Sequence, residues 1–421
     1  MNAIPYSPKK VDLYYPARRA KFFATGLPDT EAGLCAEMTR LAYCRTEPYF
    51  QFDQEQIATV LTRLGFTCQF FESTGTPGGV GTHAFLALHD DPDPERKLAV
   101  VAFRGTDAAD PIDLTDDAEF LQCEWAQGGF VHRGFAQALA HVLPALKPAV
   151  DKVQGRVLFA GHSLGAALAT LLAGVRRPDY LYTFGSPRVG DAAFVATLTG
   201  INSRRFVDCC DIVTRVPPES LPSGIKYAHH GVPYYIDRHR LITENLDDVF
   251  IGKDRLAGTA EYLLEYAWRI GNVGVRNLAD HATINYVTAV SADVSQPKLA
   301  KWRLAAGAAA VQTDAKLVSP LELPPSALTK SGLDIPPINS KDPADVACLQ
   351  KKIEFIKIQS GAGPVKLTVH CQCGKNFDVE YLNYQSILGS QVKCCQCGRE
   401  KVITEIKPED VRLRDSGLQV A

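Results

Sequence analysis

Hydrophobic residues near the start of the chain recur with the period of a helix. Leu34 and Leu41 lie on one helical face, and Asp29 or Thr30 can cap the start of that helix. Another amphipathic helix is predicted around residues 57–64. Two helices are therefore expected ahead of the first long apolar runs.

Short apolar runs then alternate with helix-forming segments to about residue 290. A run without polar positions is typical of a strand that is buried on both faces of a sheet. Alternating strands and helices favour a mostly parallel sheet covered on both sides, which is an α/β fold. The predicted strands span residues 98–103, 156–160, 180–184 and 205–209, and the predicted helices span 135–146 and a segment that begins just after Ser163.

The pattern changes after the α/β region. Residues 317–343 contain PLELPP and DIPPIN, too many prolines for a regular helix or a central strand. Beyond them, residues 353–405 alternate as strands do around a cluster of cysteines. We therefore predict a large α/β domain, a semi-rigid linker, a small β-rich module and a flexible tail, at residues 1–295, 296–345, 346–410 and 411–421.

Charge and composition restrict the kind of partner and compartment. The chain has 421 residues, a formal net charge of −2 and 12 cysteines. The near-neutral charge gives no overall reason to expect nucleic acid or an anionic membrane as a partner. Neither a signal-peptide pattern nor a spanning segment of about 18 apolar residues is evident, so a cytoplasmic location is expected. Five cysteines lie within residues 371–397, which favours a metal site in a reducing compartment.

A candidate nucleophile follows one of the predicted strands. The strand RVLFA continues into Gly161-His162-Ser163-Leu164-Gly165, and a helix-forming segment comes next. This is the G-x-S-x-G pattern between a strand and a helix, where a sharp turn exposes the serine at the edge of the sheet. The N-terminus of the following helix favours negative charge beside it. We therefore predict that Ser163 is a nucleophile.

Five segments together resemble a known family. VVAFRGT, VHRGF, GHSLGAALA, YTFGSPRVGD and DIVTRVPP occur in this order within residues 30–290. They look like the successive blocks of the class 3 lipases, a family similar to the fungal triacylglycerol lipases. The resemblance implies an α/β-hydrolase fold and hydrolysis of acyl esters, lipids in particular, without a catalytic cofactor.

A serine needs a histidine as its base and a carboxylate to orient that histidine. Asp211 follows a predicted strand and stands where the family has its acid, whereas Asp208 lies three residues earlier and is the alternative. His281, in LADHATINYV, occupies the place of the family's base. His229 and His230 resemble a block at a strand entry, so we expect structural roles for them.

The negatively charged intermediate of ester hydrolysis needs two backbone donors. The amide of Leu164 is one candidate, and the resemblance assigns the other to Thr106. Residues 107–128 correspond to the family's lid, but they are heavily acidic. They are interpreted either as a lid or as a solvated loop, and soluble short-chain esters are an alternative to lipids as substrates.

The cysteine cluster is typical of a structural zinc site. Cys371 and Cys373 form one pair, and Cys394 and Cys397 restore the common C-x-x-C spacing, with Cys395 as the competitor for the third position. Four thiolates bind Zn²⁺ tetrahedrally, and the metal supplies folding energy that a small module lacks. The module resembles a zinc ribbon whose partner the sequence does not reveal.

Two hypotheses of function follow. In the first, the chain is a carboxylic ester hydrolase in which Ser163, His281 and Asp211 act on a lipid or another acyl ester, with peripheral contact to a lipid surface as one option. In the second, it is a binding adaptor that acts through the zinc ribbon. The complete set of three residues favours the enzyme, and a peptidase on the same fold is a weaker third reading.

Overall fold

The structure, a computed structural model, divides into two compact units, residues 1–334 and 335–421. The predicted linker, residues 296–345, lies almost wholly outside the described residues and stays a prediction. The structure describes residues 6–18, 21–23, 26–46, 51–73, 81–105, 120–221, 223–244, 246–293, 297, 299, 365–371, 373–374, 376–381, 391–394, 396–398, 400–402 and 411–413.

An eight-stranded sheet forms the centre of the first unit. Its strands are ordered β1-β2-β3-β6-β7-β8-β9-β10. The five strands from β3 to β9 run parallel, while β1, β2 and β10 pair antiparallel at the two edges. The strands are β1 (Thr67–Glu72), β2 (His83–His89), β3 (Leu98–Phe103), β6 (Arg156–His162), β7 (Tyr180–Phe184), β8 (Ser203–Asp208), β9 (Pro233–Ile236) and β10 (Ile242–Glu244).

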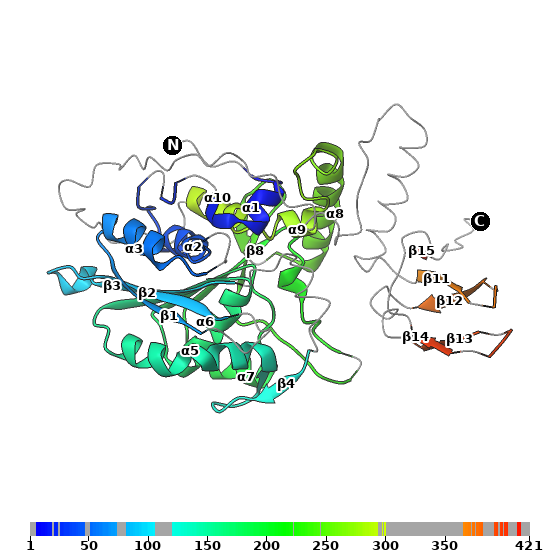
Figure 1. Cartoon of the computed structure of the whole chain (residues 1–421), viewed down its shortest axis with the longest axis horizontal. Coiled ribbons are helices and arrows are strands. Elements are labelled where there is room, and N and C mark those ends of the chain that lie inside the picture. The colour runs from blue at the N-terminus through cyan, green and yellow to red at the C-terminus, as the bar shows by residue number, and fades with distance from the viewer. Residues whose placement is uncertain are drawn as a thin grey trace. The chain divides into compact units, whose positions relative to one another are not determined.

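Helices cover both faces of this sheet, as Figure 1 shows. One apolar cluster joins α2 and α10 to one face, and another joins α5 and α6 to the opposite face. The sheet is therefore the middle of three layers, as predicted for an α/β fold. The helices are α1 (Lys10–Tyr14), α2 (Glu31–Leu41), α3 (Gln54–Arg63), α5 (Arg133–Asp151), α6 (Leu164–Val175), α7 (Ala192–Thr197), α8 (Asp248–Glu265), α9 (Arg276–Ala279) and α10 (Thr283–Ala292).

Several predicted elements appear where the pattern placed them. Thr30 caps α2, and its side chain accepts a hydrogen bond from the amide of Gly33. The helix predicted over residues 135–146 is longer, since α5 continues to Asp151. Its buried stripe continues to Val150 while both internal prolines lie on the exposed side, so burial outweighs their cost to the helix.

The sequence reading missed short elements at the edges of the first unit. Strands β4 (Gln122–Glu124) and β5 (Phe130–His132) form a separate two-stranded ribbon. Strands of three or four residues, including β9 and β10, have too few positions to show a period. Three short 3₁₀ helices, Pro16–Arg18, Pro94–Arg96 and Val213–Arg215, complete the described elements.

The second unit contains only strands among its described residues. Strand β11 (Val365–His370) pairs with β12 (Asn376–Tyr381) and with β15 (Val411–Leu413), and β13 (Gln391–Lys393) pairs with β14 (Glu400–Val402). Residues 411–413 fall within the predicted flexible tail, yet they form a strand against β11. The sequence Val-Arg-Leu alternates apolar and polar residues as a strand does, and the prediction of a flexible tail did not take this into account.

Among the helices that the structure describes, none has both the length and the apolar character required to cross a bilayer.

Candidate active site

Ser163 lies on a sharp turn between β6 and α6. Its backbone has a φ of 57° and a ψ of −128°, which a residue other than glycine adopts only under strain. A Cβ atom on Gly161 would lie 2.1 Å from the carbonyl oxygen of Gly165, and one on Gly165 would lie 2.4 Å from that of Phe103. Both flanking glycines are therefore required by close backbone contact, and the turn has the geometry of a nucleophile elbow.

The structure brings the predicted base and acid together with Ser163. The Nε2 atom of His281 lies 3.0 Å from the Ser163 hydroxyl oxygen. Its Nδ1 atom lies 3.0 Å and 2.9 Å from the two carboxylate oxygens of Asp211. A carboxylate only accepts hydrogen bonds, so Nδ1 carries the proton and Nε2 is left to accept the proton of the serine. All three side chains are buried.

Asp211 is held by further donors. The Tyr286 hydroxyl donates to its Oδ2 atom at 2.6 Å, and the amide of Val213 donates to Oδ1 at 2.9 Å. The same tyrosine oxygen accepts a hydrogen bond from the amide of Asp208 at 3.1 Å. Hydrogen bonds of this kind stabilise the ionised carboxylate. Sequence reasoning missed Tyr286, although it stands only five residues after His281.

The alternative acid and bases have other partners. Asp208 ends β8 and forms an ion pair with Arg240, at 2.7 Å and 2.6 Å from its two oxygens. The Nε2 atom of His229 lies 2.8 Å from the carbonyl oxygen of Thr214, so this histidine supports a loop. His230 is half-buried, and burial lowers its pKa to about 4. None of these three is hydrogen-bonded to Ser163.

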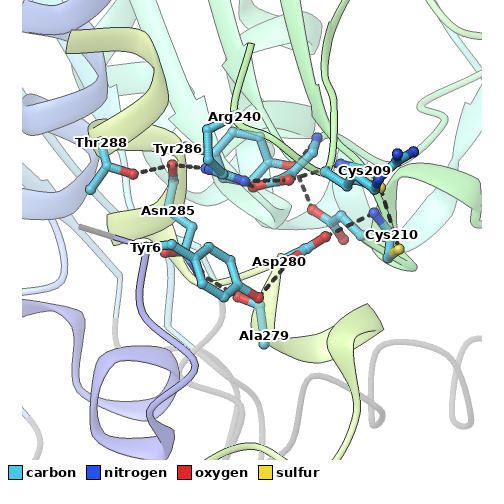
Figure 2. Close-up of polar contacts among 12 residues, drawn as sticks. Tyr6, Cys209, Cys210, Arg240, Ala279, Asp280, Asn285, Tyr286 and Thr288 are labelled. Atoms are coloured by element: carbon cyan, nitrogen blue, oxygen red, sulfur yellow. Dashed lines mark hydrogen bonds and ion pairs between the residues drawn. The ribbon is translucent and has the colours of Figure 1, made fainter. Parts of the chain in front are cut away.

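Behind the site, a second buried carboxylate fixes the loop that carries His281. Figure 2 shows Asp280 reached by Tyr6 from the N-terminal segment and by the backbone of Cys210. The Tyr6 hydroxyl donates to Oδ1 at 2.8 Å, and the Cys210 amide donates to Oδ2 at 2.9 Å. Arg276 adds an ion pair at 3.1 Å. Asp280 thus holds three segments beside the candidate base.

Two neighbouring thiols lie in the same network (Figure 2). The sulfur atoms of Cys209 and Cys210 are 3.5 Å apart, and the Cys209 thiol donates to Asp254 at 3.3 Å. With Asp280 they form a group of the size that could hold a metal ion. Because Asp254 and Asp280 already accept hydrogen bonds from protein groups, we interpret this group as structural.

One predicted oxyanion donor lies within the described residues and the other does not. Leu164 is the first residue of α6, so its amide has no acceptor within the helix. This places a backbone donor directly after the candidate nucleophile, as an oxyanion site requires. Thr106 and most of the predicted lid, residues 107–119, lie outside the described residues. Their assigned roles stay predictions.

The second unit brings four cysteine thiols together. The sulfur atoms of Cys371, Cys373, Cys394 and Cys397 all lie within 4.8 Å of one another. The Cys371–Cys397 distance is 3.6 Å and the Cys373–Cys394 distance is 3.7 Å. Four sulfurs at about 2.3 Å from a tetrahedral Zn²⁺ lie about 3.8 Å apart, so this donor set fits zinc. The cluster uses Cys394, and its competitor Cys395 lies outside the described residues.

Two similar turns present these thiols. The amide of Gly374 donates to the carbonyl oxygen of Cys371, and the amide of Gly398 donates to that of Cys394, both at 2.9 Å. Hydrogen bonds from the amides of Cys397 and Gln396, with smaller contributions from neighbouring thiols, lower the pKa of Cys394 to about 6. The turn at Cys394 therefore favours a thiolate, which is the form that binds a metal.

The fold and the first site together define the class of the protein. A mostly parallel sheet, a strained serine between strand and helix, and a histidine joined to a carboxylate are the features of an α/β-hydrolase. Residues 100–221 match the model of the class 3 lipase family. The predicted resemblance is thereby confirmed over the segment that carries Ser163 and Asp211.

Individual relatives agree with this family. The chain is 34% identical to the secreted mono- and diacylglycerol lipase 1 of Fusarium solani over 172 residues, 38% of this chain and 50% of that protein. It is 32% identical to a lipase of Rhizomucor miehei over 173 residues, 37% of this chain and 45% of that protein. The chain thus spans about half the length of these relatives. The first of them is named as secreted, and the cytoplasmic location expected for this chain stays a prediction.

Solved structures of lipases are also similar. The triacylglyceride lipase of Rhizomucor miehei has a TM-score of 0.40 at 23% identity, covering 61% of this chain and 94% of that one. The lipase of Rhizopus microsporus var. chinensis has a TM-score of 0.38 at 30% identity, covering 49% of this chain and 71% of that one.

Proposed function

We propose that the chain is a carboxylic ester hydrolase that acts on lipid esters through Ser163, His281 and Asp211. The observation that carries the proposal is the unbroken set of contacts from the serine hydroxyl through the imidazole to the carboxylate, at 3.0 Å and 2.9 Å. A serine hydroxyl is a weak nucleophile unless such a base removes its proton. The match to the class 3 lipases supports an ester as the substrate.

The geometry supports a two-step reaction. His281 takes the proton of Ser163 as the serine oxygen attacks the ester carbonyl, and Asp211 stabilises the imidazolium that forms. The amide of Leu164 donates to the oxyanion, together with a second donor that the family resemblance places at Thr106. His281 then gives its proton to the leaving alcohol, and an acyl-enzyme remains. Water, activated by His281, attacks the acyl carbonyl and releases the acid and free Ser163.

A lipid is the proposed substrate class because the curated relatives are named for it. The Fusarium solani relative is named a mono- and diacylglycerol lipase. A further relative, 28% identical over 251 residues, is phospholipase A1-II 4 of Oryza sativa subsp. japonica. All of these names refer to ester bonds of glycerolipids, which the arrangement at Ser163 suits.

Hydrolysis of graded esters tests this proposal. The purified chain is given p-nitrophenyl esters of increasing acyl length and an emulsified diacylglycerol, beside Ser163→Ala. We expect release by the wild type and only background release by the variant. If the wild type cleaved only the short soluble esters, the proposed substrate class would be soluble esters and not lipids. Background release by both proteins from every substrate would overturn the proposal and favour the adaptor hypothesis.

We further propose that the second unit binds one structural Zn²⁺ through Cys371, Cys373, Cys394 and Cys397. The distances between their sulfur atoms support a tetrahedral site, and the metal would supply folding energy to a unit in which few of the described residues are buried and apolar. Metal analysis of the full chain and of Cys371→Ser tests this. One equivalent of zinc is expected in the wild type and little in the variant, and a wild type without zinc after zinc-supplemented expression would refute the site.

A reducing compartment, and hence the cytosol, stays a proposal that rests on thiol chemistry. Four cysteines can bind zinc only as thiolates, and reducing conditions preserve them. Fractionation of cells that express the chain at its native level would test the location. Recovery of the chain from the medium alone would contradict it.

A further inference from the structure

A second buried histidine lies beside the candidate base. His162 ends β6, directly before Ser163, and its ring centroid is 4.6 Å from that of His281. Its Nε2 atom lies 2.8 Å from the backbone carbonyl oxygen of His281. Its Nδ1 atom lies 2.8 Å from the hydroxyl oxygen of Tyr43. His162 therefore connects the backbone of the base to a residue 119 positions earlier in the chain.

The partners of His162 determine which of its nitrogens carries the proton. A carbonyl oxygen only accepts hydrogen bonds, so Nε2 must donate to His281. Burial, together with the nearby His281, lowers the pKa of His162 well below its ordinary value. The ring is therefore neutral, and Nδ1 accepts the hydrogen of the Tyr43 hydroxyl. A neutral ring also avoids repulsion when His281 becomes positively charged during the reaction.

The other side of the Tyr43 hydroxyl contacts the loop that leads to Thr106. Burial raises the pKa of Tyr43 far above its ordinary value, so the hydroxyl stays neutral, and the amide of Gly105 donates a hydrogen bond to it. A Cβ atom on Gly105 would lie 2.0 Å from the hydroxyl oxygen, so this position requires glycine. Thr283 also contacts the pair, with its hydroxyl 3.3 Å from His162 Nδ1.

We propose that Tyr43 and His162 are positioning residues that join the oxyanion loop at Gly105 to the backbone of His281. One hydroxyl thereby sets both the place of the loop before Thr106 and the place of the base. The inference rests on the proposed ester hydrolysis, since an oxyanion loop has a role only in that reaction.

Removal of the Tyr43 hydroxyl tests the link, with a matched control. Tyr43→Phe is compared with Tyr182→Phe, because Tyr182 is also buried and donates to Glu31 at 2.8 Å, at the opposite end of α2. Kinetics are measured on a p-nitrophenyl ester at a temperature where circular dichroism shows both variants folded. A displaced oxyanion donor acts on the transition state alone, so kcat of Tyr43→Phe falls about 10- to 100-fold while KM stays nearly constant. Tyr182→Phe keeps both constants.

Two replacements of His162 test the other half of the link. A glutamine amide reaches about as far as Nε2 and can still donate to the His281 carbonyl, whereas an asparagine amide reaches only as far as Nδ1. His162→Gln is therefore expected to retain several-fold more kcat than His162→Asn. Equal kcat in the two variants would overturn the role of the Nε2 bond, and this comparison holds even if Tyr43→Phe does not fold.

Nuclear magnetic resonance of protein labelled with ¹⁵N-histidine tests the link without activity. Tyr43→Phe should shift the ring nitrogen signals of both His162 and His281, while Tyr182→Phe should leave them in place. If the wild type were inactive but Tyr43→Phe still shifted both sets of signals, the proposed function would be refuted while the link between Tyr43, His162 and His281 would stand. An active wild type, with unchanged His281 signals and unchanged kcat in Tyr43→Phe, would overturn the inference.

Discussion

Replacing Tyr286 with phenylalanine removes one oxygen that makes two buried hydrogen bonds. The hydroxyl donates to Asp211 at 2.6 Å and accepts from the amide of Asp208 at 3.1 Å, and the side chain is 0% exposed. A hydrogen bond to a charged group contributes about 1.5–3 kcal/mol, and a buried donor without a partner costs about 1–3 kcal/mol. Since the ring keeps its packing, we expect Tyr286→Phe to lower the free energy of unfolding by about 3 kcal/mol.

The same change should affect catalysis less than it affects stability. Asp211 keeps its contacts with His281 and with the amide of Val213, so the tautomer of the base is preserved. We expect kcat to fall about tenfold, which corresponds to about 1.4 kcal/mol in the activation barrier. KM should change little, because the lost bond does not contact substrate.

Urea unfolding followed by circular dichroism measures the first effect and steady-state ester hydrolysis measures the second. Tyr262→Phe is the control, because its buried hydroxyl donates at 2.7 Å to an uncharged carbonyl, that of Val273. It should cost about 1 kcal/mol and leave kcat unchanged. A loss for Tyr286→Phe no larger than that of the control would refute the reasoning that its hydroxyl supports a charged carboxylate.

Three further outcomes are expected. Asp211→Asn should lower kcat by about 10⁴-fold with little change in KM, since the base would lose its orienting carboxylate, and steady-state kinetics would show this. Burial and Arg133 lower the pKa of His132 to about 4, below the ordinary 6.5, so the unfolded chain binds a proton first as the pH falls. This histidine alone should therefore contribute a loss of about 2 kcal/mol in stability between about pH 8 and 5, and His132→Asn should reduce the total loss measured in urea unfolding by about that amount. A chelator should make the second unit protease-sensitive in limited proteolysis while ester hydrolysis persists.

Apolar runs were sufficient to predict the central strands, and the G-x-S-x-G pattern was sufficient to predict the turn at Ser163. Strands β3 and β7 have the predicted bounds because β3 is a continuous apolar run and β7 is a run interrupted only by Thr183. The chain order of Ser163, Asp211 and His281, together with the order of the blocks, identified three residues that the structure joins. These features depend on local composition or on linear order, and a sequence displays both.

Contacts between distant side chains could not be predicted in this way. Tyr286 reaches Asp211 only because α10 packs near the end of β8, and Tyr43 reaches His162 only because α2 covers β6. No spacing in the sequence encodes either of these two contacts. Strand β9 begins with Pro233 and has four residues, so it offers no alternation to recognise, and only the family block at His229 and His230 indicated a strand entry there.

The placement of His281 depends on residues that flank it and on a segment from the other end of the domain. Asn285 exchanges two hydrogen bonds with the backbone of Ser7, at 2.8 Å and 2.9 Å, while Tyr6 donates to Asp280. A base on a loop must stay within hydrogen-bond reach of its serine, and a few tenths of an ångström decide that reach. Because the loop is bonded on both sides of the imidazole, the N-terminal segment is part of what holds the base, although no motif in that segment indicates a catalytic role.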